Sequence, residues 1–557
     1  MSDTKEVTAR KHPKALPFLF FTEMWERFGY YLMLGIFVLY MIDVKNGGLA
    51  IPDKSADDIF GTFIAFTYLT PFLGGFLADR KFGYIKSVYF GGILMAAGYL
   101  GLALPGFTTF YVSVALIIIG NGFFKPNIST LLGNLYSEPE YKAKKDSGYN
   151  LFYMGINIGA FLGPILAAFM RNKYGWPAAF ATAGIGMLIG LVVFTIGLKH
   201  FKHADVMKPV EKGDASMGKV FGGVFLPAIV AGVLGWILPK YIFGVENVFG
   251  SNSTDAFIAA AIPVVIFYIS LWFKANATDK RPIAALLVIF ALSASFWAVF
   301  KQNGTALTRW AKYYTDREVA QVIEKPARTF YQVETMPTKI DSVVKYDEQF
   351  QAVKVDGQVV KELGRDVYFR NLPPDKQPVN DEPVYLTSTE LFQSVNPLWV
   401  VLLTPVVVGF FALLNRRGRE PSTATKIAFG LLISASSTLV MVWAVYAGSN
   451  GEVKVSPMWL VGCYGVITVG ELLLSPMGLS LVSKLSPPRL TALMMGGFFL
   501  STSIGNKMSG VLASMWYDYE DKSHFFLFNC MLLLISAGLA FMLLKWLNGI
   551  MKEKNLK

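Results

Sequence analysis

Residues 16–42, LPFLFFTEMWERFGYYLMLGIFVLYMI, form an apolar stretch that is long enough to cross a lipid bilayer as a single helix. Glu23, Glu26, Arg27 and Tyr30 interrupt it at steps of three and four, which places them on one helical face. A charge at that depth costs about 2.5–3.5 kcal/mol on insertion scales, so this face must contact protein or a wet cavity. A buried ion pair that only fixes helix packing is one explanation. Three ionisable groups within five residues favour a functional site.

The whole chain has the composition of a protein that crosses the bilayer many times. It has 557 residues, of which 53% are hydrophobic and only 16% are charged, against roughly 25% in soluble domains. Apolar runs of the required length recur along the sequence. They predict membrane spans at 16–42, 56–78, 86–105, 109–134, 147–170, 176–198, 219–243, 255–274, 281–304, 388–414, 424–448, 455–482, 488–515 and 524–547.

The net charge of +12 is distributed as membrane topology requires, which argues against a nucleic-acid partner. Alternate loops between the predicted spans are rich in Lys and Arg, and the short loops between them are acidic or nearly neutral. Basic loops face the cytoplasm by the positive-inside rule. We therefore expect a multi-pass protein of the inner (plasma) membrane with both termini cytoplasmic. The basic groups lie at 5–14, 80–86, 142–145, 199–219, 274–281, 416–419 and 545–554.

The predicted spans divide the chain into three parts. Residues 1–198 form an N-terminal six-helix bundle, residues 199–280 a cytoplasmic linker with two additional spans, and residues 281–557 a C-terminal six-helix bundle. Two such bundles are expected to surround a binding site near the midplane of the bilayer. The C-terminal part contains an extracytoplasmic insert at 312–390. Within it, residues 351–360 alternate around an Asp-Gly turn and predict a β-hairpin.

Residue types for catalysis or metal binding are scarce in this sequence. Only four His occur, all in predicted loops or tails, and Cys463 and Cys530 lie inside predicted spans. The sequence contains no metal-ligand cluster and no nucleophile elbow. We therefore expect no enzyme activity, no cofactor and no metal site. The insert at 312–390 is expected to be a lid or a small strand element, and a receptor or scaffold that works through it is an alternative function.

Five motifs along the chain resemble those of the proton-coupled oligopeptide transporter family, the peptide-transporting branch of the major facilitator superfamily. They occur in the family's order and are EMWERFGYY (23–31), GFFKPNIS (122–129), FYMGINIG (152–159), QSVNP (393–397) and GELLLSPMG (470–478). A loop between the second and third predicted spans, GFLADRKFG (75–83), also resembles the superfamily's cytoplasmic signature.

The resemblance implies an all-α membrane protein with the major facilitator fold, in which two extra transmembrane helices lie between two six-helix bundles. It also implies a proton-coupled symporter that imports di- and tripeptides by alternating access around a central cavity. Its partners are then the peptide, protons and the lipid bilayer, and we expect a monomer. By the same resemblance, Arg27 and Lys125 face the substrate carboxylate and Glu471 faces its amino group. The residues expected to hold the peptide backbone are Tyr30, Tyr31, Tyr68 and Asn157.

Peptide transport requires residues of these types on physical grounds as well. A peptide zwitterion in a low-dielectric cavity needs both ends paired, because an unpaired buried charge costs several kcal/mol. Proton coupling requires a carboxylate whose affinity for a proton changes with conformation. Glu23 and Glu26 meet this requirement because they stay ionised while Arg27 pairs with them. We expect one of them to bind a proton once Arg27 turns to a substrate carboxylate.

Three positions depart from the family pattern. Leu34 stands where the family usually has a second arginine, and Lys301 stands where it usually has the glutamate that pairs with that arginine. We therefore expect the usual outer gate and one proton-linked carboxylate to be absent. Phe498 replaces a tryptophan and is expected to enlarge one wall of the cavity. The central acids and bases then balance, so an alternative is the same fold carrying another peptide-like or anionic small solute with altered proton coupling.

Overall fold

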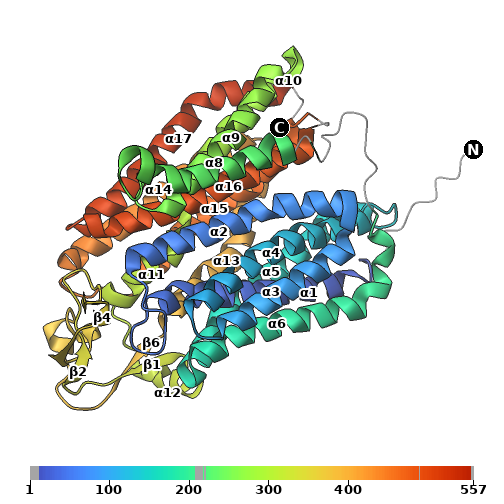
Figure 1. Cartoon of the computed structure of the whole chain (residues 1–557). Helices are drawn as coiled ribbons and strands as arrows, with labels where there is room; N and C mark the ends of the chain where they lie inside the picture. Colours follow the sequence, from blue (N-terminus) through green and yellow to red (C-terminus); the bar gives the residue numbers. More distant parts are fainter. Residues whose placement is uncertain (1–11, 207–217, 219–220, 488–489, 554–557) are drawn as a thin grey trace, which may run out of the picture.

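The computed structural model describes residues 12–206, 218, 221–487 and 490–553. Most of them lie in long helices that run side by side, so the predicted all-α membrane class is confirmed (Figure 1). Within the described residues, twelve helical segments are long and apolar enough to cross a membrane. The parts of the predictions that lie outside the described residues are 1–11, 207–217, 219–220, 488–489 and 554–557.

The first six long helices share one apolar core, which is built from buried side chains between Ala15 and Ala204. α1 packs against α5 and α6, and α3 packs against α4. Close approach of α1 to α5 depends on small residues, because a Cβ at Gly163 would lie 2.7 Å from the backbone nitrogen of Leu32. The six helices are α1 (Leu16–Ile42), α2 (Asp53–Leu77), α3 (Tyr84–Leu102), α4 (Phe107–Leu135), α5 (Lys145–Tyr174) and α6 (Trp176–Gly197).

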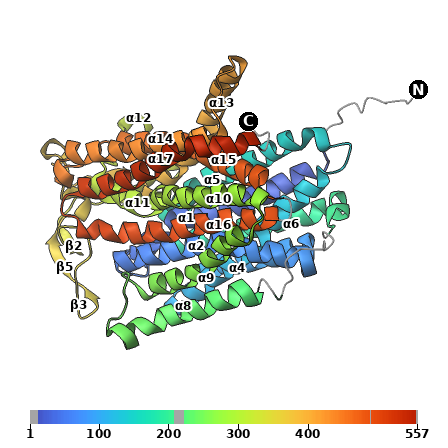
Figure 2. The same ribbon diagram turned by 90° about the horizontal axis from the view of Figure 1, so that it is seen from above.

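Of the last six long helices, all but α13 share a second core, which is built from buried side chains between Ile283 and Met551. α14 packs against α15 and α17, while α13 projects from the other helices (Figure 2). The six helices are α10 (Ala277–Phe300), α13 (Val395–Arg416), α14 (Thr423–Ala447), α15 (Met458–Leu485), α16 (Thr491–Ser514) and α17 (Lys522–Glu553). Beyond α10 the chain continues through short turns, which are η7 (Lys301–Gly304), α11 (Ala306–Arg309) and η8 (Trp310–Tyr314).

A helical hairpin lies between the two sets of six helices in the sequence and beside both of them in space. It consists of η5 (Phe221–Phe225), α8 (Leu226–Leu238), η6 (Pro239–Phe243) and α9 (Asn252–Lys274). α9 contacts α2 of the first set as well as α10 and α16 of the second (Figure 2). The hairpin therefore covers the line along which α2 and α16 meet.

The insert forms a small layer of strands and turns at one end of the helices (Figure 1). The predicted hairpin at 351–360 is confirmed, because Asp356 and Gly357 both have positive φ and join two antiparallel strands. Three antiparallel pairs form, β1 with β6, β2 with β5 and β3 with β4. The elements are α12 (Gln321–Thr329), β1 (Val333–Met336), β2 (Asp341–Val344), β3 (Lys354–Val355), β4 (Gln358–Val359), β5 (Lys361–Gly364) and β6 (Val384–Thr387).

The insert contacts both sets of helices. Asn172, at the end of α5, donates to the Ser388 hydroxyl at 2.7 Å. The backbone of Asn371 accepts from that of Lys454 at 2.8 Å, next to the start of α15. We call this end of the molecule the insert end.

Candidate functional site

Glu23, Glu26 and Arg27 form a compact buried cluster in α1, as their spacing predicts. Arg27 Nη2 donates to Glu26 Oε1 at 2.5 Å, and Arg27 Nε donates to the other oxygen of the same carboxylate. Glu23 Oε1 lies 3.4 Å from Arg27 Nε. None of the three side chains is more than 5% exposed. The amide oxygen of Asn121, in α4, accepts a further bond from Arg27 Nη2 at 3.2 Å.

The Tyr68 ring is the meeting point of two lysines from different parts of the chain. Lys125 Nζ, from α4, lies 4.4 Å from the ring centre. Lys301 Nζ, from η7, lies 5.7 Å from the same centre. Tyr68 also interacts electrostatically with Arg27 and Glu471. Side chains of both sets of helices therefore converge on one aromatic ring.

Glu471 is positioned by hydrogen bonds between α13 and α15. The amide nitrogen of Asn396 donates to Glu471 Oε2 at 3.2 Å and to the Thr468 hydroxyl at 2.8 Å. The two motifs at 393–397 and 470–478 therefore meet in space. Glu471 also interacts electrostatically with Lys301. The site thus has the carboxylate of Glu471 on the second set of helices and the cations Arg27 and Lys125 on the first.

The remaining predicted backbone-binding residues border this cluster. The rings of Tyr30 and Tyr31 meet edge to face with centres 5.4 Å apart, and Arg27 lies over the Tyr30 ring at 5.0 Å. Tyr31 interacts electrostatically with Tyr68, Arg27 and Glu471. Asn157 instead donates to the carbonyl of Tyr153 in its own helix at 3.0 Å. Its amide is therefore engaged within α5.

The two altered positions that carry apolar side chains lie in the cores. Leu34 is buried among the side chains of the first core. Phe498 is buried in the second core, where its ring centre lies 6.4 Å from that of Phe290. Phe498 was expected to enlarge one wall of the cavity. In the structure its side chain instead packs within the C-terminal helices.

Three further residues belong to the site, and the sequence offered partial signals for them. Asn121 directly precedes the motif at 122–129, and its amide nitrogen also donates to the Thr67 carbonyl at 2.8 Å. Asn396 and Tyr153 lie inside motifs, and Tyr153 interacts electrostatically with Tyr68, Glu23 and Glu471. Their partners depend on how helices cross, which no spacing along one helix reveals.

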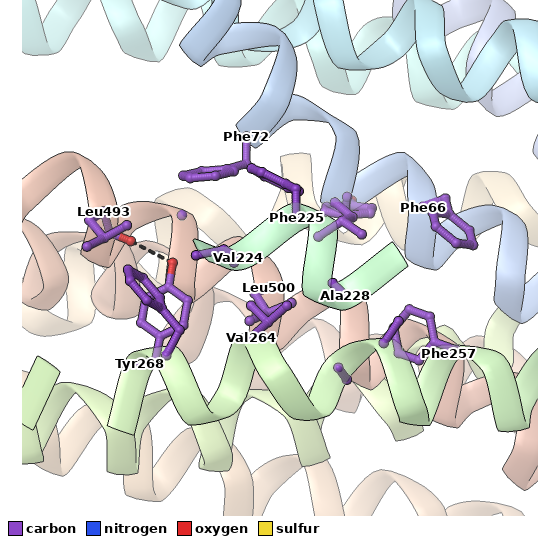
Figure 3. Close-up of a pocket in the computed structure, with 16 residues that line it drawn as sticks. Phe66, Phe72, Val224, Phe225, Ala228, Phe257, Val264, Tyr268, Leu493 and Leu500 are labelled. Atoms are coloured by element: carbon purple, nitrogen blue, oxygen red, sulfur yellow. Dashed lines mark hydrogen bonds between the residues drawn. The ribbon is translucent and has the colours of Figure 1, made fainter. Parts of the chain in front are cut away.

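A separate pocket lies under the helical hairpin, between α2, α8, α9 and α16 (Figure 3). Its walls are phenylalanine, leucine, valine and alanine side chains, together with Tyr68 and Tyr268. The Tyr268 hydroxyl is already bonded to the Leu493 carbonyl at 2.9 Å. Among the described residues, no charged side chain lines it, so it does not provide the paired charges that a peptide zwitterion requires.

Known proteins resemble this chain over nearly its whole length. It is 30% identical to the uncharacterized transporter YclF of Bacillus subtilis (strain 168), over 92% of this chain and 90% of that protein. It is also 30% identical to the peptide transporter YePEPT of Yersinia enterocolitica, over 90% of this chain and 87% of that protein. A crystal structure of a peptide transporter POT in complex with sulfate superposes with a TM-score of 0.74 at 29% identity, covering 97% of both chains.

The sequence profile of the POT family matches residues 85–334 and 384–527, which together form well over half of the chain. The matched ranges include Lys125, Lys301 and Glu471, and the buried α1 cluster precedes them. The chain therefore belongs to the POT family, the proton-coupled oligopeptide transporters that its motifs resemble.

Proposed function

We propose that the protein imports di- and tripeptides together with protons, through the buried charged site around Tyr68. The observation that carries this proposal is the buried set of opposite charges on the two sets of helices. Arg27 and Lys125 belong to the first set, while Lys301, directly after α10, and Glu471 belong to the second. A zwitterion bound between them pairs both of its ends without leaving a buried charge uncompensated.

Each site residue then has a distinct role in binding the peptide. Lys125 and Arg27 bind the substrate carboxylate, and Glu471 binds its amino group. Asn396 orients Glu471 through the 3.2 Å hydrogen bond to one of its carboxylate oxygens. The residues that contact the peptide backbone are Tyr30, Tyr31, Tyr68 and Asn157.

Proton coupling is assigned to Glu23 and Glu26. Arg27 is shared between them, so its release toward a substrate carboxylate leaves negative charge without its partner. A proton then restores neutrality in a buried site. The membrane potential supplies about 2.3 kcal/mol per 100 mV, and a pH gradient supplies about 1.4 kcal/mol per unit.

The two cores correspond, in this proposal, to the bundles that move against each other during alternating access. The first is residues 1–198 and the second is residues 281–557, with the linker and hairpin at 199–280 between them. Lys and Arg placement puts the insert end outside the inner membrane and both termini in the cytoplasm. The insert then acts as an external cover on a monomeric transporter.

Labelled dialanine in proteoliposomes tests the function. We expect counterflow into vesicles loaded with unlabelled dialanine, and accumulation when the outside is made acidic. A protonophore should stop the accumulation and leave the counterflow. Absence of counterflow would contradict the proposal.

Glu26→Gln tests the coupling in the same vesicles. We expect counterflow without accumulation, because the substituted side chain cannot take up and release a proton. Asp518→Asn is a matched control at an exposed ion pair, and this variant should retain both counterflow and accumulation. Accumulation by Glu26→Gln would exclude Glu26 as the coupling group.

A further inference from the structure

The helical hairpin is in contact with the bilayer over most of its surface. Its two spans, 222–243 and 252–274, are long and apolar enough to cross the membrane, but only 11% of the most apolar 18 residues of each are buried in the protein. Exposed apolar side chains follow both helices, among them Ile229, Trp236 and Ile266. An apolar surface of this extent marks contact with a membrane. Lipid acyl chains therefore surround the hairpin.

The pocket beneath the hairpin is lined by apolar side chains from four helices (Figure 3). Rings of α2 meet rings of the hairpin at two places. The ring centres of Phe66 and Phe257 lie 6.2 Å apart, and those of Phe72 and Phe225 lie 5.7 Å apart. α16 provides the remaining wall, in which Leu500 is only 9% exposed. The pocket therefore borders both sets of helices as well as the hairpin.

Water is a poor occupant for this pocket, whereas an apolar chain fits it. A buried water needs about two to four polar partners. Among the side chains that line the pocket, only those of Tyr68 and Tyr268 are polar, and the Tyr268 hydroxyl is bonded to the Leu493 carbonyl. The cavity volume is about 90 Å³, whereas one water takes up about 10–15 Å³. Atoms that line an empty space lose their packing contacts, so an apolar chain that fills it is stabilising.

The hairpin is tightly packed at one level and open at another. A Cβ at Gly235, in α8, would lie 2.5 Å from the Cβ of Ala259, so α8 and α9 touch there. A Cβ at Gly222 or Gly223, in η5, would meet nothing within 4 Å, and both residues are exposed. The next residue, Val224, lines the pocket. An acyl chain can therefore approach the pocket from the bilayer beside η5.

We propose that this pocket binds an acyl chain of a membrane phospholipid. The chain is apolar like the walls, and it is the material that surrounds the hairpin on its outer face. Inside the pocket it contacts α2 of the first set of helices and α16 of the second. It also contacts Tyr68, whose ring lies under Lys125 and Lys301 of the central site. One side chain then connects the bilayer with the central charges.

Photolabelling from within the bilayer tests the site. The full-length protein is reconstituted into phosphatidylcholine vesicles in which one acyl chain carries a diazirine group, and labelled residues are located by mass spectrometry after irradiation. We expect label at Ala228 and Leu500, which line the pocket, and at Ile266, which faces lipid. Met494 is fully buried outside the pocket and gives the background. Label at Ile266 with only background at Ala228 and Leu500 would overturn the proposal.

Filling the pocket assigns the label to it. Ala261 lines the pocket, so Ala261→Phe places a ring in the space of the chain, and label at Leu500 should fall to the background at Met494. Ile262→Phe is the matched control, because this neighbouring residue of α9 is 53% exposed and lies outside the pocket lining. Label at Leu500 should persist in this control. Label at Ile266 in both variants shows that the hairpin still spans the bilayer.

A second variant and the absence of substrate keep the test decisive. If Ala261→Phe does not fold, Val264→Phe fills the same pocket from the next turn of α9. Equal label at Leu500 in the filled variant and in Ile262→Phe would overturn the proposal. The labelling needs no peptide, so its result is independent of the proposed function: label at Leu500 without dialanine counterflow would support the lipid site and contradict only peptide transport.

Discussion

The buried cations at the insert end and those in the central site differ in how they are paired. At the insert end, Arg309 lies 2.6 Å from Asp57, Lys507 lies 2.5 Å from Asp58, and Arg171 lies 2.7 Å from Glu390. Each of these pairs joins the first six helices to a later part of the chain. In the central site, Lys125 and Lys301 lie over aromatic rings instead.

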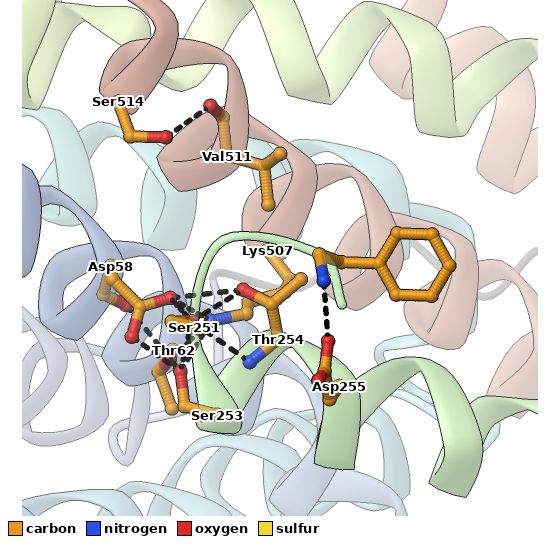
Figure 4. Close-up of polar contacts among 10 residues, drawn as sticks. Asp58, Thr62, Ser251, Ser253, Thr254, Asp255, Lys507, Val511 and Ser514 are labelled. Atoms are coloured by element: carbon orange, nitrogen blue, oxygen red, sulfur yellow. Dashed lines mark hydrogen bonds and ion pairs between the residues drawn. The ribbon is translucent and has the colours of Figure 1, made fainter. Parts of the chain in front are cut away.

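This difference in ion pairing indicates which end of the molecule is closed and where a ligand binds. The paired charges that join α2 to α11 and to α16 need no further partner, so they favour a closed insert end. Unpaired charges in the centre are stabilised only when an anion arrives, because breaking or omitting a buried pair costs several kcal/mol. The hairpin reinforces the closed end, since Ser251 and Thr254 donate to Asp58 at 2.8 Å and 3.0 Å (Figure 4).

The largest effect is expected when one buried pair at the insert end is broken. Arg309→Leu leaves Asp57 and Asp53 without their cation. The closed form should lose about 3–5 kcal/mol, the usual cost of an uncompensated buried charge. Spin-label distances between α2 and α16 at the insert end should then shift to longer values.

An exposed pair at the same end provides the control for that experiment. Lys54 and Asp518 are both about half exposed, so Lys54→Met should change the closed form by less than about 1 kcal/mol. Equal distance distributions for Arg309→Leu and Lys54→Met would show that burial of the pair is not what closes this end.

Packing between α2 and α16 should have the next largest effect. A Cβ at Gly61 would lie 2.8 Å from the Cα of Gly510, and backbone cannot yield as a side chain can. Gly61→Ala should therefore cost the closed form about 1–3 kcal/mol. Gly538→Ala is the matched control, because that helical position faces open space. Accessibility of the cavity to a thiol reagent from the insert end should rise only in Gly61→Ala; no rise would mean that the helices separate elsewhere.

A smaller effect is expected at the hairpin. The Ser253 hydroxyl donates to Asp58 and accepts from Lys507 Nζ at 2.9 Å. Ser253→Ala removes these bonds but leaves the ion pair, so the closed form should lose about 0.5–1.5 kcal/mol. Ser436→Ala, whose hydroxyl bonds only within its own helix, should have no effect on the same distance measurement. A shift as large as that of Arg309→Leu would mean that the hairpin, and not the ion pair, holds the end closed.

The helices could be predicted from the sequence because a bilayer leaves little freedom. Every backbone group in hydrocarbon must be bonded within its own helix, so hydropathy locates most of the spans. α1 has the predicted bounds, whereas α13 begins at Val395 instead of 388 because residues 389–394 form a tighter 3₁₀ turn. Such turns depend on local hydrogen bonds that hydropathy does not register.

Only those site residues could be predicted from the sequence that carry a charge deep inside a predicted membrane span. Glu23, Glu26 and Arg27 were found because charges inside a span are expensive. Asn121 and Asn396 were missed because uncharged amides carry little such cost, and their bonds cross between helices. The direction in which the Phe498 side chain points could not be predicted from the sequence, for a different reason. The polar residues of α16 between Ser501 and Ser509 do not fix the direction of Phe498, and packing against Phe290 reveals it.

The smallest effect is expected for acidification. In the pH range where a proton gradient drives transport, a fall in pH should hardly change the insert end. Burial alone would raise the pKa of Glu334 in β1, but Arg317 and Arg171 outweigh it and lower the pKa from 4.5 to about 2. A carboxylate with a lowered pKa stabilises the folded form above its ordinary pKa and loses that contribution as the pH falls toward the lowered value.

Attachment of β1 to α5 should therefore be constant from pH 8 down to about 5 and weaken between 4.5 and about 2. Hydrogen exchange in β1 measures this, and Glu334→Gln should remove the acid-dependent loss. A loss of protection with a midpoint near pH 6, abolished in Glu334→Gln, would show that external protons open the insert end directly. Constant protection of β1 from pH 8 down to about 5 would indicate that protons and peptide act at the central charges and not at the ion pairs of the insert end.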